Sequence, residues 1–313
     1  MPYCLSLKDG AEIAMIKNTK EPIYITDCDY NSKPEINTTL ENKVKIFEKF
    51  LRRDTNLMKK DIDLLTNYYK QGYTEIDTDK PKLNNKYDQA LEYVDNSLKR
   101  FMNFDSKTFL QPIFPKRHWL CYITGLSGSG KSFYISQLIK NNFPKDQLVY
   151  LFSPVEGDEA FEDLNIFQVH LQTFEEDFGQ PFTIEMLKGT KEQPSIVIMD
   201  DINTFNNKKV RDMYIDVQNQ LLERGRHLNI RTMTVSHNPL AGAFSKAPIR
   251  ESEFYVLFPS SNYRDSKVLL ESYTGLSKQE IEEILNLNTR GVILKKSVPS
   301  YYVADHNIGI LGK

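Results

Sequence analysis

A glycine-rich segment near the middle of the chain has the residue types that are needed to bind a phosphate chain. It fits the pattern G-x-x-x-x-G-K-[ST] at every fixed position, and its residues are Gly125, Leu126, Ser127, Gly128, Ser129, Gly130, Lys131 and Ser132. Glycines allow left-handed backbone angles, so several N–H groups can face one anion. We expect Lys131, as an exposed loop residue, to place its charge on the β- and γ-phosphates and Ser132 to offer its hydroxyl to Mg²⁺. The segment predicts a nucleoside-triphosphate site with ATP and Mg²⁺ as ligands.

A pair of carboxylates forms the second group of candidate catalytic residues. The run 195–199, SIVIM, is typical of a strand that is buried on both faces of a parallel sheet, and Asp200 and Asp201 follow it directly. In nucleotide-hydrolysing enzymes one such carboxylate holds Mg²⁺ and another polarises the attacking water. We assign the metal to Asp200 and the water to Asp201. The alternative is that both only cap the next helix, since Asp is a common helix cap.

Polar residues at the end of a further strand are candidates for sensing the bound phosphate. The strand expected over 231–235 runs into Ser236, His237, Asn238 and Pro239. The carboxyl ends of parallel strands lie at one edge of the sheet, so His237 or Asn238 can contact the γ-phosphate or the attacking water. The alternative is a simple turn before Pro239, because Ser, Asn and Pro favour turns.

Two arginines stand between the preceding helix and this strand. Arg224 and Arg226 flank Gly225 after a helix expected over 210–222. Arginine near a helix C-terminus often does no more than complement the helix dipole, and this is the alternative to a catalytic role.

Hydrophobic periodicity places these segments in an α/β domain over residues 111–313. Short β-prone runs at 120–124, 147–152, 195–199, 231–235 and 254–258 are separated by segments that include helical spacing, as in 133–138. A capping box at Ser277 and Glu280 predicts a short helix, and the two runs around Pro299 predict a terminal hairpin.

Residues 1–110 are expected to form a mainly helical region whose role is unknown. Apolar residues recur at helical spacing from Leu40 and again from Tyr87, which predicts an antiparallel helical pair. Such apolar stripes are usually packing or docking surfaces. The segment 23–26, IYIT, can form a short strand, whereas 27–39 is typical of a loop.

Composition limits the classes of protein that the chain can represent. Its 313 residues are 40% apolar and 26% charged, as in soluble globular proteins. No run approaches the ~18 apolar residues of a membrane helix, so we expect no membrane span. The net charge of −2 argues against a generally basic nucleic-acid-coating surface, although a local basic patch remains open. Residues 1–10 also lack the apolar core of a signal peptide, and with the missing membrane helix this predicts a cytoplasm-like compartment. Cys4, Cys28 and Cys121 are too few and too scattered for a disulfide framework, which predicts reduced thiols.

Taken in order, these motifs resemble those of the genome-packaging ATPases of large DNA viruses, the poxvirus-like branch of the FtsK–HerA superfamily. The resemblance covers roughly residues 119–304 and rests on GLSGSGKS, Asp200-Asp201, the element 224–227 and TVSHNP. The chain departs from the pattern in two places. Asp201 stands where many relatives have Glu, and His237-Asn238 stands where others have Gln.

The resemblance implies a RecA/ASCE-type parallel sheet flanked by helices, a homo-oligomeric ring, and DNA-stimulated ATP hydrolysis that drives double-stranded DNA into a viral capsid. It also implies capsid proteins as partners and a location at the viral assembly site in the host cytoplasm or in the virion. Arg226 would reach the neighbouring subunit's nucleotide as a trans finger, with Arg224 as the other candidate. Two further classes stay open, a P-loop nucleotide or small-molecule kinase and a nucleotide-gated assembly scaffold.

Overall fold

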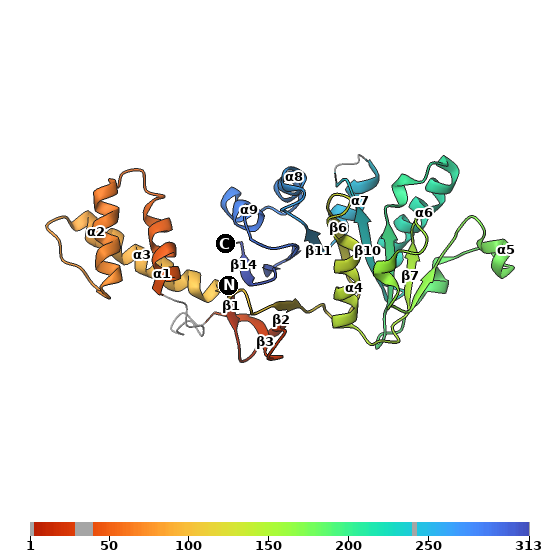
Figure 1. The fold of residues 1–313 in the computed structure, drawn as a ribbon, viewed down its shortest axis with the longest axis horizontal. Helices are drawn as coiled ribbons and strands as arrows, with labels where there is room; N and C mark the ends of the chain where they lie inside the picture. The colour runs from red at the N-terminus through yellow and green to blue at the C-terminus, as the bar shows by residue number, and fades with distance from the viewer. Residues whose placement is uncertain (1–2, 29–39, 240–242, 313) are drawn as a thin grey trace.

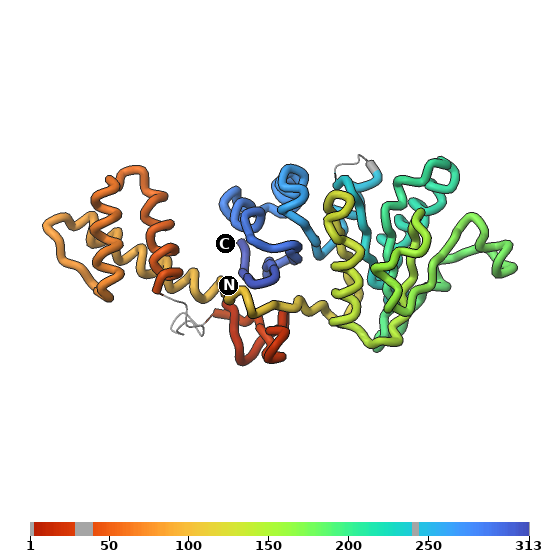
Figure 2. The backbone as a smooth tube through the Cα atoms, in the orientation of Figure 1, coloured from red at the N-terminus to blue at the C-terminus, as the bar shows by residue number. Residues whose placement is uncertain are grey.

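The computed structural model describes residues 3–28, 40–239 and 243–312. The molecule is elongated, with a helical region at one end and the larger α/β part at the other (Figure 1). The first and last strands meet between these parts, so segments from both ends of the sequence lie side by side (Figure 2).

A ten-stranded sheet forms the centre of the α/β part. Its spatial order is β4-β14-β13-β12-β11-β6-β10-β9-β7-β8. The parallel strands are β6 (Leu120–Thr124), β7 (Val149–Phe152), β8 (Ile166–Gln168), β9 (Ser195–Asp200), β10 (Ile230–Ser236) and β11 (Phe254–Leu257). The antiparallel extension consists of β12 (Val292–Lys295), β13 (Ser300–Val303), β14 (Asn307–Leu311) and β4 (Phe101–Asn103). The predicted α/β class, the terminal hairpin and the five predicted strands of the parallel part are confirmed.

Strand β10 lies between the phosphate-loop strand β6 and the carboxylate strand β9. It pairs in parallel with both, Ser236 opposite Thr124 and Val235 opposite Asp200. This is the inserted strand that the ASCE-type arrangement requires. The carboxyl ends of the three strands therefore form one continuous edge.

Helices cover both faces of the parallel strands, because successive side chains of a strand point to opposite faces. Ile196 and Ile198 of β9 belong to the core that contains α4 (Lys131–Asn142). Val197 and Met199 belong to the core that contains α6 (Lys208–Arg224).

The remaining helices complete this part of the molecule. Helices α8 and α9 pack on the antiparallel extension, and the predicted capping box at Ser277 and Glu280 opens α9. Their bounds, with those of the other short helices, are α5 (Phe174–Phe178), α7 (Ala243–Glu251), α8 (Tyr263–Tyr273) and α9 (Lys278–Leu285).

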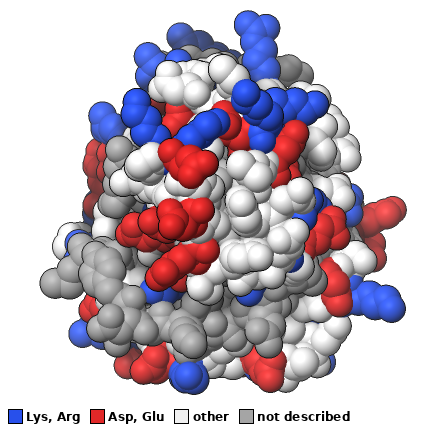
Figure 3. All heavy atoms as spheres, turned by 90° about the vertical axis from the view of Figure 1, so that its left-hand side faces the viewer, with Lys and Arg blue, Asp and Glu red and all other residues white. Residues whose placement is uncertain are grey.

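The N-terminal region contains more structure than the sequence predicts. It has three helices rather than a pair, α1 (Leu40–Leu51), α2 (Lys59–Lys70) and α3 (Pro81–Arg100). The first stripe is broken at a turn in which the Asp54 carboxylate accepts the N–H of Asn56. Figure 3 looks onto this helical end, where many basic side chains gather toward the top of the view and several acidic side chains lie together below them.

A small four-stranded sheet combines three strands that precede α1 with one strand that follows α3. The strands are β1 (Tyr3–Ser6), β2 (Ala11–Ile16), β3 (Pro22–Asp27) and β5 (Leu110–Pro112), in the order β1-β3-β2-β5. The short strand expected at 23–26 is confirmed within β3. The division of the chain at residue 110 stays a prediction.

The prediction of reduced thiols is wrong for one cysteine pair. Antiparallel pairing of β1 with β3 sets Cys4 opposite Thr26, and Cys4 forms a disulfide with Cys28 across a Cα–Cα distance of 5.1 Å. This separation lies within the usual disulfide range. Cys121 is a free, buried thiol.

Among the helices of the described ranges, none has the length and apolarity that a bilayer span requires.

Candidate active site

The glycine-rich segment forms the predicted loop between a buried strand and a helix. Strand β6 is buried along its whole length, and α4 begins at Lys131. Gly128 and Gly130 have φ of 73° and 88°, angles that a side chain disfavours. The loop therefore has the backbone that an anion nest requires, at the positive end of the α4 dipole.

Lys131 is buried, with 6% of its surface exposed, so the expectation of an exposed loop lysine is wrong. As the first residue of α4 it folds back under the loop, where Nζ donates to the carbonyl oxygens of Gly125 at 2.9 Å and Leu126 at 3.1 Å. Burial lowers the pKa of the Lys131 amine. The Lys131 ammonium group, which is expected to bind phosphate, thus donates its hydrogen bonds to carbonyl groups of the loop itself.

A histidine joins the loop to the carboxylates. Nζ of Lys131 lies 2.7 Å from Nδ1 of His237, and Nε2 of His237 lies 2.7 Å from Oδ2 of Asp201. An ammonium group only donates, so Nδ1 accepts and Nε2 carries the proton that is donated to Asp201. The three side chains therefore form one hydrogen-bonded chain across the carboxyl edges of β6, β10 and β9.

The backbone fixes Asp201 within this chain. Its N–H donates to the carbonyl oxygen of Val235 at 3.1 Å, and its Oδ1 accepts the N–H of His237 at 2.9 Å. Asp201 has a φ of 44°, a left-handed conformation that costs free energy in a residue other than glycine. Such strain is typical of positions where function dictates the direction of a side chain.

Asp200 lies beside the chain in a different environment. Its Oδ2 accepts a hydrogen bond from Ser153 Oγ at 3.1 Å, and Ser153 follows the end of β7. Burial, and secondly the charge of Asp201, raise the pKa of the Asp200 carboxyl to about 6. The two neighbouring carboxylates therefore differ in both partners and environment.

The capping alternative finds little support in the geometry of the two carboxylates. Helix α6 is capped by Asn207, whose side chain accepts from the N–H groups of Lys209 and Val210. Asp201 precedes a short 3₁₀ turn without making a side-chain cap.

The alternative that this segment is only a turn before Pro239 fits Asn238 but not His237. Ser236 Oγ donates to the carbonyl oxygen of Asn238 at 3.0 Å and accepts the N–H of Asn238 at 3.2 Å. The structure thus brings His237 into contact with Lys131 and Asp201, whereas the backbone of Asn238 closes a local turn.

Neither candidate arginine lies at the phosphate loop of its own chain. Arg224 forms an ion pair with Glu185. Arg226 is exposed and lines a hollow of 610 Å³ with Arg117, His118 and Lys191. Both arginines precede β10, whereas His237 follows it. The length of this strand, about 20 Å, separates them from Lys131.

Two residues were not predicted from the sequence, Ser153 beside Asp200 and Arg290 beside the phosphate loop. Ser153 could have been found from the sequence, because it directly follows an apolar strand in the same way as Asp200 does. Arg290 had no such signal, since it lies before the antiparallel hairpin and only the fold brings it near the loop. A Cβ placed on Gly130 would lie 2.5 Å from Nη2 of Arg290, so the guanidinium packs against the bare backbone of the loop.

The residues at this edge fit a magnesium ion only together with a nucleotide. Mg²⁺ prefers oxygen ligands and is usually bound by one or two carboxylates with substrate phosphates and water. Asp200 supplies a carboxylate, and Ser132 and Ser153 supply hydroxyls. In the described part of the chain no three acidic, His or Cys side chains form a complete metal site.

Comparison with known proteins finds a relative in a virophage and likenesses to solved structures. No family model matches the chain. Uncharacterized protein V3 of the Sputnik virophage is 30% identical over 192 residues, which are 60% of this chain and 75% of that protein. The structure of the pCW3 conjugation coupling protein TcpA, in its monomer form with ATPγS, matches at a TM-score of 0.40 and 12% identity, over 66% of this chain and 65% of TcpA. The genome packaging NTPase B204 of Sulfolobus turreted icosahedral virus 2 matches at 0.39 and 11% identity, over 62% of this chain and 96% of B204.

Proposed function

The chain belongs to the family of uncharacterized protein V3 of the Sputnik virophage, and we propose that it is an ATP-hydrolysing motor that drives double-stranded DNA into a viral capsid. The observation that carries the proposal is the chain of hydrogen bonds from Lys131 through His237 to Asp201. It connects a phosphate-binding loop to a carboxylate across three adjacent parallel strands. A loop that only stored a nucleotide would not need this connection.

Phosphate binding requires a change of partners at Lys131. Its ammonium now donates to Gly125, Leu126 and His237, so contact with the β- and γ-phosphates replaces some of these hydrogen bonds. When Lys131 turns to the phosphates, Nδ1 of His237 becomes free to accept a hydrogen bond from the attacking water or, once protonated, to donate one to the γ-phosphate. Nucleotide binding would thereby prepare the hydrolytic groups.

The two carboxylates serve separate tasks in this mechanism. The Asp201 carboxylate accepts a hydrogen bond from Nε2–H of His237 and would orient and polarise the attacking water. Asp200, with Ser132 and Ser153, would hold Mg²⁺, which when bound neutralises charge on the phosphate oxygens. A bound cation would stabilise the desolvated Asp200 carboxylate more than Asp201, because a buried charge that is not paired with an opposite charge is costly.

The position of Arg226 supports a ring of subunits. An exposed arginine at the amino edge of the sheet cannot reach the phosphate loop at the carboxyl edge of the same subunit. A head-to-tail arrangement sets the amino edge of one subunit against the carboxyl edge of the next and closes into a ring. Arg226, with Arg224 as the other candidate, would then stabilise charge on the neighbour's nucleotide.

The DNA substrate rests on the ordered motifs that resemble packaging ATPases, namely GLSGSGKS, Asp200-Asp201, the element 224–227 and TVSHNP. Capsid proteins as partners, and a place at the viral assembly site in the host cytoplasm or in the virion, follow from the same resemblance.

ATP turnover with and without double-stranded DNA tests this function. We expect DNA to stimulate hydrolysis and Lys131→Ala to abolish it without unfolding the chain. The matched control is Lys140→Ala on the same helix, whose side chain pairs with Asp163 on the surface. Turnover that responds to a small acceptor rather than DNA would indicate a kinase, and nucleotide binding with negligible turnover would indicate a scaffold. Unchanged turnover in Lys131→Ala would remove the proposed site.

A further inference from the structure

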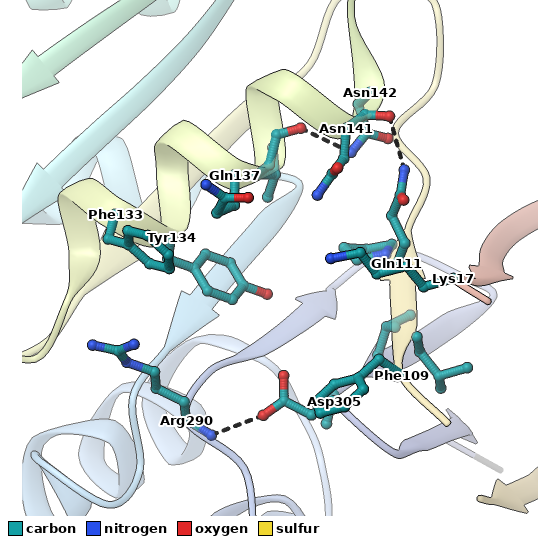
Figure 4. Close-up of a pocket in the computed structure, with 15 residues that line it drawn as sticks. Lys17, Phe109, Gln111, Phe133, Tyr134, Gln137, Asn141, Asn142, Arg290 and Asp305 are labelled. Carbon is teal, nitrogen blue, oxygen red and sulfur yellow. Dashed lines mark hydrogen bonds between the residues drawn. The ribbon is translucent and has the colours of Figure 1, made fainter. Parts of the chain in front are cut away.

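A cavity of 190 Å³ opens beside α4, directly next to the phosphate loop (Figure 4). Phe133, Gln137 and Asn141 line it from the helix, and Arg290 and Asp305 line it from the antiparallel part of the sheet. Phe133 is two positions after Lys131. The cavity therefore begins where a nucleotide bound to the loop would leave it.

Arg290 connects the cavity to the loop. A Cβ on Gly130 would lie 2.5 Å from Nη2, 3.0 Å from Cζ and 3.1 Å from Nε of Arg290, so the guanidinium packs closely against this glycine. Its Cζ is 5.6 Å from the centre of the Phe133 ring. A cation and an aromatic face thus lie together at the junction of loop and cavity.

These groups have few partners within the described part of the chain. The Arg290 guanidinium pairs with no carboxylate there, because Asp305 accepts instead from Thr289 Oγ1 at 2.9 Å and from the N–H of Arg290 at 3.1 Å. Phe133 is 52% exposed. The side-chain amides of Gln137 and Asn141 make no hydrogen bond with described residues. A flat apolar face with unpaired amides suits a nucleobase, and the unpaired cation suits a phosphate.

We propose that this cavity binds the nucleoside end of the nucleotide whose phosphates lie on the loop. The base packs on Phe133, the amides of Gln137 and Asn141 contact its polar edge, and Arg290 faces the α-phosphate. The proposal rests on the proposed nucleotide site and adds to it where the base lies and which side chains select it.

Comparison of ATP with inorganic tripolyphosphate separates the cavity from the loop, because both ligands carry a triphosphate and only ATP carries a nucleoside. Binding of each to the full chain is measured by calorimetry in the presence of Mg²⁺. Phe133→Ala should weaken ATP binding about tenfold, since loss of the stacking of a base on an aromatic ring costs roughly 5- to 150-fold in affinity. Tripolyphosphate binding should not change.

Two further variants make the test specific. Gln137→Trp should fill the cavity and reduce ATP affinity to that of tripolyphosphate. Phe178→Ala is the control, since Phe178 is equally exposed, at 51%, and does not line the cavity. It should leave both affinities unchanged.

Several outcomes would overturn the proposal. Cavity variants that bind ATP like the original chain, or that lose ATP and tripolyphosphate equally, would contradict it. An original chain that binds tripolyphosphate as tightly as ATP would overturn it while leaving the phosphate site intact. Binding of neither ligand would overturn the proposed function as well.

Discussion

Nζ of Lys131 lies 2.7 Å from Nδ1 of His237, although the two residues are 106 positions apart in the sequence. The contact joins the first residue of α4 to the residue that follows β10. Because the other ring nitrogen contacts Asp201, a shift of Lys131 toward a phosphate alters the hydrogen bonding of the imidazole and the carboxylate together. The phosphate loop and the Asp201 carboxylate are therefore already connected through His237 in the nucleotide-free protein.

His237→Ala should slow hydrolysis while ATP binding changes little. In the proposed mechanism the imidazole orients Asp201 and accepts a hydrogen bond from the attacking water, and loss of one such preorganised group typically costs about 10²–10³ in kcat. Steady-state kcat and KM measure the two effects separately.

His237→Gln is the matched variant, because its amide both accepts and donates a hydrogen bond. It should retain more activity than His237→Ala. Equal rates for the alanine variant and the original chain would show that the histidine is only part of a turn.

Asp201→Asn should leave nucleotide binding nearly intact and slow turnover, whereas Asp200→Asn should also weaken Mg²⁺-dependent binding. The reason is the assignment of water to Asp201 and metal to Asp200. Titration of ATP with and without Mg²⁺, followed by rate measurements, tests both. Identical defects in binding and rate would contradict the division of roles.

The stability of the nucleotide-free protein should reveal the cost of burying Asp200. Its pKa is raised to about 6, so the folded state holds this proton more tightly than the unfolded chain does. The proton on Asp200 therefore stabilises the folded state below pH about 4, and this stabilisation is lost as the pH rises to about 6. Asp200→Asn should therefore raise the free energy of unfolding at pH 7 by about 2–3 kcal/mol, and by little at pH 4.

Urea unfolding at the two pH values measures this difference. Asp216→Asn, an exposed substitution on α6, is the control and should have almost no effect. An Asp200→Asn variant that is less stable at pH 7 would show that the carboxylate contributes more through its hydrogen bond with Ser153 than burial costs.

The sequence predicted the parallel strands well, because buried parallel strands are apolar runs bounded by turn residues. It missed β8, whose three residues are too few to show a period. It also missed β14, whose NIGIL segment follows the predicted hairpin without a clear turn signal. Short strands such as these depend on the strands beside them more than on their own pattern.

The candidate site was predictable to the extent that it lies at strand ends. Asp200, Asp201 and His237 each follow an apolar run, and parallel pairing brings those ends together. The burial of Lys131, the disulfide between Cys4 and Cys28 and the approach of Arg290 to Gly130 arise from packing between distant segments. No local pattern contains that information.

Arg226→Ala should remove most ATP turnover while ATP still binds. Arg226 lies at the opposite edge of the sheet from Lys131, so any action on a phosphate must be on a neighbouring subunit. A trans arginine stabilises transition-state charge and is worth about 10³–10⁵ in rate in related phosphoryl-transfer enzymes. Nucleotide binding and turnover of the variant, with DNA present, test this expectation.

Mixing two inactive variants distinguishes a ring motor from an enzyme that works as a monomer. A subunit with Arg226→Ala keeps an intact phosphate loop, and a neighbour with Lys131→Ala keeps an intact Arg226, so mixed assemblies should contain some complete sites. The ATPase rate should rise above that of either variant and pass through a maximum as the mixing ratio changes. Arg224→Ala, mixed in the same way, tests the other arginine, whose ion pair with Glu185 would have to open. If neither arginine variant recovers activity in preparations that are shown to co-assemble, both arginines only complete the end of α6 and the ring mechanism loses its trans contact.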